Sequence, residues 1–335
     1  MNSSFLKRLV VRVFGKLLNL KNKGLYTFHH LDSPTPLLLP LNYHYDPLKH
    51  INSGTDSKQR ELLYICSPTQ RSGTNFLSNI LQLCNDIYIP TGDHLPKEHF
   101  IYSHANLLSQ YFRKTLGYWD KWVKEKDTLQ EIHREMLAYA GDGIINYFLK
   151  EQQNAGQRLL LRTPDSGNLE YFFNLFPNGQ VICILRDGRD TVDSFTRSFS
   201  GDWAFKKMCK RWAARVDHIM MIKDQLEKAN QNRKLLLVKY EELNTAPQRP
   251  VEDLLNFLGI SKSNFEWDKL KKIPVVGSST QYEKQTGDFW QPSFKADPKM
   301  FSNKWVNWST RKKRIFKKIA GDQLIKTGYE KGFDW

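Results

Sequence analysis

The sequence lacks the long apolar run that a membrane-spanning helix requires. No hydrophobic stretch in its 335 residues approaches the roughly 20 residues needed to cross a bilayer. Charged residues recur between positions 7 and 16, so the chain also shows no clean apolar segment followed by a small-residue cleavage site. We therefore expect a cytoplasmic protein without a secretory signal peptide.

Cysteine is scarce, with four residues that lie far apart along the chain. None of them forms a Cys-x-x-Cys pair, so we expect neither a zinc site nor a disulfide scaffold. Cys66 and Cys183 stand inside apolar runs, where a thiol behaves as a small buried hydrophobic group. Free thiols of this kind are typical of a reducing compartment.

Acidic residues are missing from two segments of an otherwise mixed sequence. The chain has 50 basic and 35 acidic residues, a net charge of +15. Residues 1–24 hold six of the basic residues and residues 299–318 hold eight, with no acid in either segment. Because the remainder is nearly neutral, a uniformly basic nucleic-acid-binding surface is disfavoured, and we expect no nucleic-acid partner.

An amphipathic pattern occupies residues 5–20, where apolar pairs recur every fourth position with basic residues between them. Such a helix either contacts a membrane surface or packs on the rest of the chain with its basic face in water. Residues 32–58 contain four prolines, which indicates an irregular connection. We therefore divide the chain into an N-terminal extension, residues 1–58, and a main domain, residues 59–335.

Short apolar runs alternate with helical patterns in the main domain. Strands are predicted at Glu61–Ser67, Arg158–Arg162, Gln180–Leu185 and Lys234–Val238. Helices are predicted from Phe76 to Leu83, over 121–150, over 189–199, over 203–229 and near 251–258. This alternation predicts an α/β fold with a parallel sheet covered on both faces, in which ligands bind beyond the carboxyl ends of the strands.

The first candidate site is the loop Ser67–Leu77 (SPTQRSGTNFL), between a strand and a helix. A helix N-terminus offers unpaired N–H groups to an anion, and Arg71 adds a fixed positive charge. The loop differs from a Walker A motif, because Ser67 and Ser72 stand where its two glycines belong and Gly73 stands where its lysine belongs. The loop is therefore typical of an anion site that is not an ATPase loop.

A second candidate anion site follows the strand QVICIL. Arg186 stands at the strand end, and Ser194 lies eight residues later, about two turns into the next helix. An arginine and a hydroxyl so placed could hold a phosphate. Asp187 and Asp190 lie near the helix start, where we expect them to act as capping residues.

Together these segments resemble the sulfotransferase family, whose members use 3′-phosphoadenosine-5′-phosphosulfate (PAPS) as the sulfuryl donor. The family has a loop similar to QRSGTN after its first strand and a segment similar to RDGRDTVDS after a later one. The stretch Val238–Ile260 (VKYEELNTAPQRPVEDLLNFLGI) is also similar to the family, and RTPDSGNLEYFFNLFPNGQ is similar to many bacterial members. The resemblance covers residues 61–260 and favours the bacterial and carbohydrate-type branches over the cytosolic small-molecule branch.

The resemblance implies a three-layer α/β sandwich with a parallel central sheet, similar to P-loop nucleotide kinases. It also implies roles in binding the phosphosulfate end of the donor. Arg71 would contact the 5′-phosphate and the leaving bridging oxygen, and Phe76 would stack on the adenine. The residues around the phosphosulfate would be Ser72, Gly73, Thr74 and Asn75.

The same resemblance implies roles at the other end of the donor. Arg186 and Ser194 would bind the 3′-phosphate, and Lys304 in the segment FSNKW would close over it. Tyr240 would lie near the adenine. Arg162 matches a position that could assist at the acceptor or at the sulfuryl group. Transfer of this kind needs positioning and charge stabilisation, and no metal is required.

Three residues are candidates for the general base that takes the acceptor proton. The string KEHF is similar to the family's Glu-x-x-Phe-Phe region and favours Glu98. An ungapped comparison with glucosaminyl-type relatives favours Asp93. The string HLP favours His94, although it lies nearer the first loop than in the cytosolic branch.

Two other classes of function remain open from the sequence: a P-loop kinase or NTPase, and a basic module that binds nucleic acid or membrane through the two charged segments. For a sulfotransferase, the acceptor would be a hydroxyl or amine of a small molecule, lipid or glycan. Aromatic residues that could line its pocket are Trp119, Trp122, Trp203 and Trp290. The oligomeric state is not readable.

Overall fold

The computed structural model describes residues 61–90, 95–123, 125–150, 156–200, 202–271, 273, 275–278, 292–295 and 303–335. All of these belong to one compact unit. The expected helix over 5–20, the irregular segment 32–58 and the residues Asp93, His94 and Trp290 lie outside the described residues.

A five-stranded parallel sheet forms the centre of the described structure, in the order β2-β3-β1-β4-β5. Its strands are β1 (Leu63–Cys66), β2 (Ile87–Tyr88), β3 (Arg158–Arg162), β4 (Gln180–Leu185) and β5 (Leu235–Lys239). Cys66 pairs with Cys183 across β1 and β4, and Leu185 pairs with Lys239 across β4 and β5. The strands predicted from the apolar runs are thus confirmed, with β2 as a short addition.

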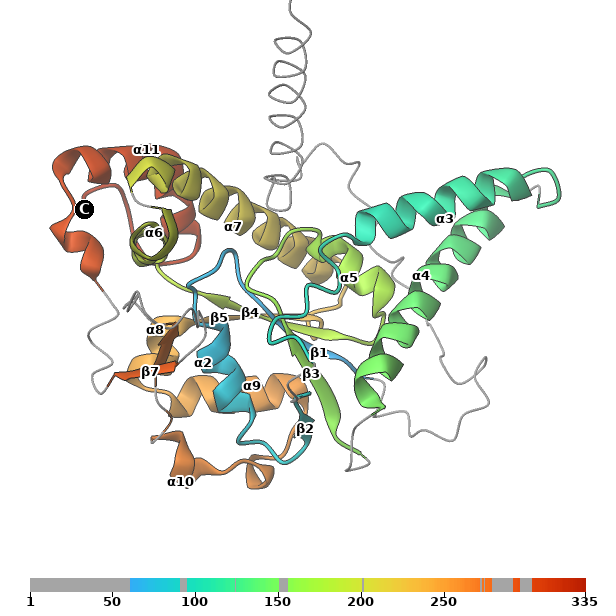
Figure 1. Cartoon of the computed structure of the whole chain (residues 1–335), viewed down its shortest axis with the longest axis horizontal. Helices are drawn as coiled ribbons and strands as arrows, with labels where there is room; N and C mark the ends of the chain where they lie inside the picture. The colour runs from blue at the N-terminus through green and yellow to red at the C-terminus, as the bar shows by residue number, and fades with distance from the viewer. Residues whose placement is uncertain are drawn as a thin grey trace, which may run out of the picture. The chain divides into compact units, whose positions relative to one another are not determined.

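Helices cover both faces of this sheet. Successive residues of a strand point to opposite faces, and apolar residues on both faces of β1 are buried against helices. Tyr64 and Cys66 of β1 pack into a core with α4 (Lys126–Leu149), α5 (Leu169–Leu175) and α7 (Phe205–Lys228). Leu63 and Ile65 pack on the other side with α2 (Thr74–Leu81), α8 (Tyr240–Thr245) and α9 (Gln248–Leu258). The three layers are visible in Figure 1 and confirm the predicted fold class.

Two helical predictions differ from the structure in their limits. The helix predicted over 121–150 begins at Lys126, and a separate helix that was not predicted, α3 (Ala105–Trp119), precedes it and packs against it. The helix predicted over 189–199 is α6 (Gly188–Phe195), which continues as a π-helical turn, Thr196–Ser200. A π turn is invisible to apolar periodicity and often marks a functional site.

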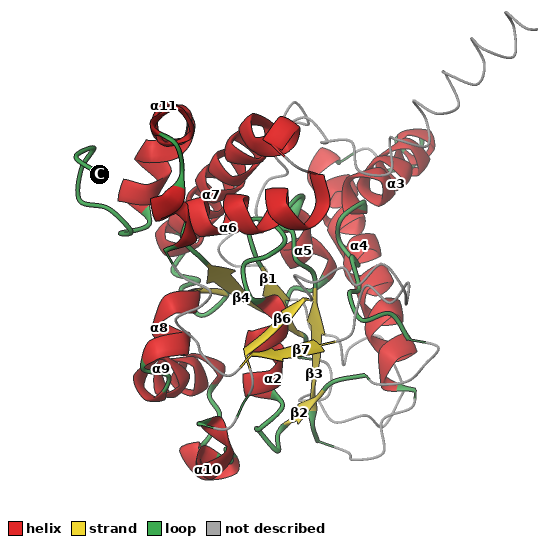
Figure 2. Ribbon diagram, turned by 60° about the vertical axis from the view of Figure 1, so that its left-hand side comes forward, coloured by secondary structure: helices red, strands yellow, loops and turns green. Residues whose placement is uncertain are grey.

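The C-terminal part packs against α6 and α7 and forms a third cluster of buried residues. It comprises the 3-10 turn Lys304–Asn307 and α11 (Thr310–Lys326), whose side chains include much of the basic segment 299–318. Figure 2 shows α11 beside α6 and α7, on one side of the sheet. Smaller elements are the 3-10 turns Asp202–Ala204 and Lys262–Asn264, α10 (Trp267–Leu270) and an antiparallel pair, β6 (Val275–Ser278) and β7 (Pro292–Lys295).

Candidate functional site

The candidate site residues gather at the carboxyl edge of the sheet. Because β1, β3, β4 and β5 run parallel, the segments that follow them meet at one edge. The loop 67–73 follows β1 and Arg186 follows β4, while Tyr240 is the first residue after β5. Arg162 is the last residue of β3, where it pairs with Ile65. The topology therefore brings together residues that are up to about half the chain apart.

The first loop is held in shape by its own hydroxyl groups. Ser67 and Ser72 both donate hydrogen bonds from Oγ to the carbonyl oxygen of Thr69, at 2.9 and 2.8 Å. All three side chains are buried. These two serines stand where a Walker A loop has glycines. Their hydrogen bonds restrict the conformation of the turn, whereas glycines would make its backbone more flexible.

Gly73 occupies a position that no other residue could fill without a shift. Its φ of 101° lies in the left-handed region, and a Cβ there would lie 2.5 Å from Cδ2 of Tyr240. The helix α2 begins at the next residue, Thr74, with Asn75 second. The backbone of the first loop is therefore in contact with the residue that follows β5.

The two predicted anion loops are joined directly by hydrogen bonds. Nε of Arg71 donates to Oγ of Ser194 at 3.0 Å, and Nη1 of Arg186 donates to the carbonyl oxygen of Arg71 at 2.7 Å. Arg71 itself has a φ of 76°, an unusual backbone conformation for a side chain of its size. Three residues chosen from two separate motifs thus form one connected group.

This group concentrates positive charge in a partly desolvated place. Burial, together with the positive charges of Arg186 and Arg197, lowers the pKa of Arg71 to about 10. The guanidinium groups of Arg71, Arg186 and Arg197 repel one another, and a ligand with several negative charges that binds among them offsets this repulsion. The site is therefore suited to a polyanion.

The residues proposed to contact the adenine lie next to this cluster. The rings of Phe76 and Tyr240 meet edge to face with centroids 5.8 Å apart, and Cζ of Arg186 lies 5.0 Å from the Tyr240 centroid. Phe76 is 5% exposed and Tyr240 is 4% exposed. Little of either ring is left for a purine to cover, so stacking on Phe76 remains a prediction.

Asp187 and Asp190 have different roles in the structure, although both were expected to cap α6. Asp187 does cap it, because its Oδ1 accepts the N–H of Arg189 at 2.8 Å. The carboxylate of Asp190 instead accepts the backbone N–H groups of Asn303 and Lys304, at 2.7 and 2.8 Å. The expectation for Asp190 was wrong because its partners come from a segment more than 110 residues away.

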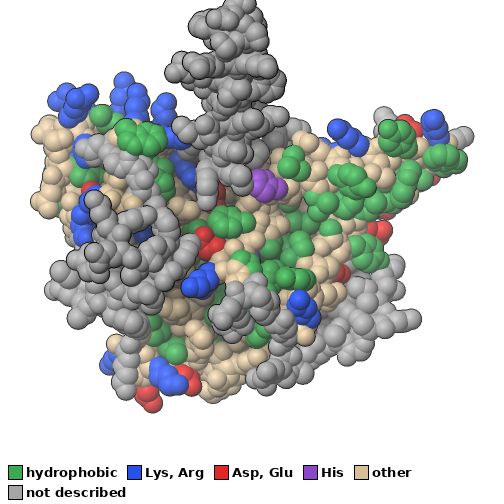
Figure 3. All heavy atoms as spheres, in the orientation of Figure 1, with side chains coloured by type: hydrophobic (Ala, Val, Ile, Leu, Met, Phe, Trp, Pro, Cys, Tyr) green, Lys and Arg blue, Asp and Glu red, His purple; other side chains and the backbone are tan. Residues whose placement is uncertain are grey.

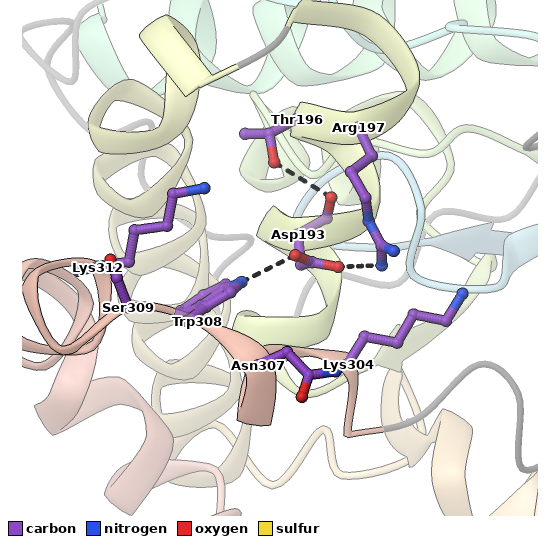
Figure 4. Close-up of a pocket in the computed structure, with 8 residues that line it drawn as sticks. All are labelled: Asp193, Thr196, Arg197, Lys304, Asn307, Trp308, Ser309 and Lys312. Carbon is purple, nitrogen blue, oxygen red and sulfur yellow. Dashed lines mark hydrogen bonds and ion pairs between the residues drawn. The ribbon is translucent and has the colours of Figure 1, made fainter.

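Lys304 lies beside the second loop, where Asp190 holds its backbone. It lines a cavity of about 630 Å³ between α6 with its π turn and the C-terminal segment. Figure 4 shows Lys304 and Arg197 extending to the same side of this cavity. Its lining residues are Asp193, Thr196, Arg197, Lys304, Asn307, Trp308, Ser309 and Lys312.

Arg197 is a residue of this region that the sequence motifs did not single out. Its guanidinium is paired with the carboxylate of Asp193, whose other oxygen accepts Nε1–H of Trp308 at 2.8 Å. Arg197 stands three residues after Ser194, and residues at this spacing lie on nearly the same face of a helix. This spacing is the signal in the sequence that could have identified it.

Glu98 lies beside the end of β3, in the segment that runs along Arg162. Backbone hydrogen bonds fix this segment: the N–H of His99 donates to the carbonyl of Arg162 at 2.9 Å, and Nε of Arg162 donates to the carbonyl of Lys97 at 3.0 Å. Burial raises the pKa of the half-buried Glu98, whereas the charge of Arg162 lowers it. Arg162 also binds Oγ of Ser78 in α2, the helix that follows the first loop.

The candidate acceptor-side tryptophans that the structure describes are not enclosed. Trp119, at the end of α3, is 39% exposed, and Trp122 and Trp203 are 76% and 80% exposed. Figure 3 shows hydrophobic side chains along the exposed surface of α3 and α4. Assignment of these residues to an acceptor pocket therefore remains a prediction.

Within the described residues, no group of three or more histidine, cysteine, aspartate and glutamate side chains is placed to hold a metal ion. Nor does any described helix combine the length and apolarity needed to cross a bilayer. The four cysteines are all free and buried, including Cys66 and Cys183 in the central strands.

Comparison with known proteins assigns the family. The model of the sulfotransferase family matches residues 67–264, which include both anion loops and the stretch around Tyr240. The chain therefore belongs to the sulfotransferase family, and the enzyme class predicted from the sequence is confirmed.

Solved structures with a similar arrangement include the sulfotransferase domain of the olefin synthase of Synechococcus PCC 7002, at 17% identity and a TM-score of 0.48, covering 81% of this chain and 97% of that one. The sulfotransferase domain of the curacin biosynthetic pathway has 16% identity and a TM-score of 0.47, covering 81% and 98%. A mouse sulfotransferase, SULT7A1, complexed with PAP has 13% identity and a TM-score of 0.43, covering 82% and 87%. No curated protein sequence matches the chain.

Proposed function

We propose that the chain transfers the sulfuryl group of PAPS to a hydroxyl or amine of a small-molecule, lipid or glycan acceptor. The observation that carries this proposal is the connection of the two anion loops through Arg71. Its Nε–H reaches Ser194 of the second loop, and its carbonyl accepts a hydrogen bond from Arg186. A ligand with anionic groups at two ends, as PAPS has, suits a site made of two joined anion loops.

The charges of the site residues and the close approach of the loop backbone support binding of this donor. Repulsion from Arg186 and Arg197 adds to burial in lowering the pKa of Arg71. A bound polyanion would offset this repulsion between the arginines. Gly73 brings the loop backbone close to Tyr240 without a side chain in the way. In this proposal Arg71 and residues 72–75 hold the phosphosulfate, Arg186 and Ser194 hold the 3′-phosphate, and Lys304 closes over it.

The reaction moves one sulfuryl group and one proton. The acceptor oxygen or nitrogen forms a bond to sulfur while the bond from sulfur to the bridging phosphate oxygen breaks, which leaves adenosine 3′,5′-bisphosphate. Arg71 stabilises the charge that develops on the leaving oxygen, and Glu98 takes the acceptor proton. Burial that raises the pKa of Glu98 makes its carboxylate a better proton acceptor than an exposed one.

The other parts of the chain have simpler proposed roles. Residues 59–335 form the sulfotransferase domain, and the basic helix predicted over 5–20 supplies peripheral contact with a membrane surface. The net charge of residues 299–318 attracts a polyanionic donor or acceptor. A cytoplasmic location is proposed from the free thiols.

Ligand-induced thermal stabilisation tests the donor. Adenosine 3′,5′-bisphosphate should raise the melting temperature of the full chain, because a ligand that binds only the folded state stabilises it. AMP should do so less, and ATP with Mg²⁺ should have little effect. Stabilisation by ATP–Mg²⁺ with none by adenosine 3′,5′-bisphosphate would instead support a P-loop kinase or NTPase.

Glu98→Gln tests the base and leaves the donor site intact. We expect turnover to fall by about 10²-fold or more, while the dissociation constant of adenosine 3′,5′-bisphosphate stays unchanged. Transfer is read as the mass increase of one sulfuryl group across a panel of alcohol, phenol, amine and glycan acceptors. Full activity in Glu98→Gln, with loss in Asp93→Asn or His94→Gln, would move the base to one of those residues.

A further inference from the structure

We propose that Arg197 is a specificity-determining residue for the 3′-phosphate of the donor, which it binds by exchanging its ion pair with Asp193 for one with the phosphate. This inference rests on the proposed function and extends it, because no motif of the two anion loops includes Arg197. The position of the residue, its present partner and its charge each support the exchange.

The position of Arg197, close to Ser194 along the same helical segment and beside Lys304 in the cavity, supports a role at the proposed 3′-phosphate site. The residue lies three positions after Ser194, in the π turn that extends α6. It lines the cavity of about 630 Å³ together with Lys304, the residue expected to close over the 3′-phosphate. Figure 4 shows both basic side chains directed to the same side of that cavity.

The present partner of Arg197 is one that an anionic ligand can displace. Arg197 and Asp193 form an i,i+4 ion pair in which the arginine side chain is 54% exposed and the aspartate side chain is 12% exposed. Because the guanidinium is open to solvent, this pair is screened by water, whereas a bidentate pair of arginine with a phosphate dianion is stronger. When Arg197 moves to the phosphate, the Asp193 carboxylate still accepts the hydrogen bond from Nε1–H of Trp308.

The charge of Arg197 already acts on the donor site. It is one of the two charges that, together with burial, lower the pKa of Arg71. Since Arg71 is hydrogen-bonded to Ser194, the positive charge of the Arg197 guanidinium acts electrostatically on this pair of residues. A phosphate bound at Ser194 would therefore reduce the repulsion between two arginines in addition to pairing with them.

Calorimetric titration with two nucleotides tests the assignment, because adenosine 3′,5′-bisphosphate and AMP differ only in the 3′-phosphate. Arg197→Ala should weaken binding of the bisphosphate by about 10–100-fold, the loss expected for a charged hydrogen-bonded contact. Binding of AMP should change by less than about 3-fold. Asp193→Asn should have the opposite effect and tighten bisphosphate binding by about 2–5-fold, because the competing carboxylate charge is removed.

Lys228→Ala is the matched control, since Lys228 forms an exposed i,i+4 pair with Asp224 on α7, outside the cavity. It should leave both affinities unchanged. Equal losses for the two nucleotides in Arg197→Ala, or no gain in Asp193→Asn, would overturn the inference. A gain in affinity cannot come from misfolding, so the Asp193 variant remains decisive if Arg197→Ala is unstable. Failure of the wild-type chain to prefer the bisphosphate over AMP would instead reject the proposed function itself.

Discussion

Arg71 and Ser194 lie 123 residues apart in the sequence, and Nε of the arginine donates a hydrogen bond to Oγ of the serine at 3.0 Å. The contact joins the loop after β1 to the helix after β4. It places the residue proposed to act at the leaving oxygen in contact with the residue proposed to hold the 3′-phosphate. One side chain therefore connects the two ends of the proposed donor site.

Arg71→Lys should separate charge from geometry at this contact. Lysine keeps a positive charge but lacks the Nε–H that reaches Ser194, so binding of adenosine 3′,5′-bisphosphate should weaken by about 10-fold or more. Ser194→Ala should also weaken binding. Because the two residues share a hydrogen bond, the double variant should lose less than the two single losses combined. Strict additivity in a double-mutant cycle would show that they act independently.

Gly73→Ala should destabilise the protein and impair donor binding together. The new Cβ would lie 2.5 Å from the Tyr240 ring and the backbone would remain at a φ of 101°, so we expect a loss of about 2 kcal/mol or more in the free energy of unfolding. Denaturant unfolding measures this loss.

Gly117 and Gly143 provide the controls for that substitution. Both lie within helices, in α3 and α4, and a Cβ at either would meet nothing within 4 Å. Replacement by alanine should be neutral or should stabilise the protein by up to about 1 kcal/mol. A Gly73→Ala protein as stable as these variants would contradict the close contact with Tyr240.

Asp190→Asn should act on the donor site through Lys304. The aspartate accepts two backbone N–H groups, and asparagine can accept only one of them while directing an amide N–H at the other. We expect several-fold weaker binding of adenosine 3′,5′-bisphosphate and no further loss when Lys304→Ala is added. Asp217→Asn, which alters the contacts of Asp217 with Gln323 and Lys326, should leave the affinity unchanged.

His99 should make stability depend on pH in the acidic range. Burial lowers its pKa to about 4, and the neighbouring charge of Arg162 acts in the same direction. The unfolded chain therefore binds the proton more tightly, and stability is lost as pH falls from about 6.5 towards 4, by about 1–3 kcal/mol. The pH range below 6.5 is thus where this histidine destabilises the fold.

His99→Asn should remove this part of the pH dependence. The asparagine oxygen can replace Nδ1 as acceptor of the Arg162 N–H, which the histidine accepts at 3.1 Å. Unfolding free energies of both proteins are compared between pH 4 and 7, so that the titration of all other groups cancels. Parallel curves for the two proteins would show that His99 is not a source of acid sensitivity.

The strands and the positions of the two anion loops could be predicted because they depend on local sequence. β3 and β4 coincide with the runs RLLLR and QVICIL, since strands buried on both faces are continuously apolar. The order of strands and helices then required the loops to meet at the carboxyl edge. The limits of α6 and the existence of α3 could not be predicted this way, because packing rather than periodicity decides them.

The candidate site was predictable in part. Arg71, Arg186 and Ser194 were selected from motifs, and the structure brings them into direct contact. Arg197 was missed because it stands in neither motif, and its electrostatic effect on Arg71 and its place beside Lys304 in the cavity are set by the tertiary structure. Asp190 was misread as a cap, because its partners lie in the segment around residue 303.

The sequence by itself determined the α/β class, the family and the two anion loops, because apolar runs and short motifs encode them locally. Only the tertiary structure decided which positive charges act on Arg71, which carboxylate accepts the backbone N–H of Lys304, and why residue 73 must be a glycine. Those properties depend on contacts between residues that are far apart in the chain. Their geometry is set by the packing of α6, the C-terminal segment and the sheet edge against one another.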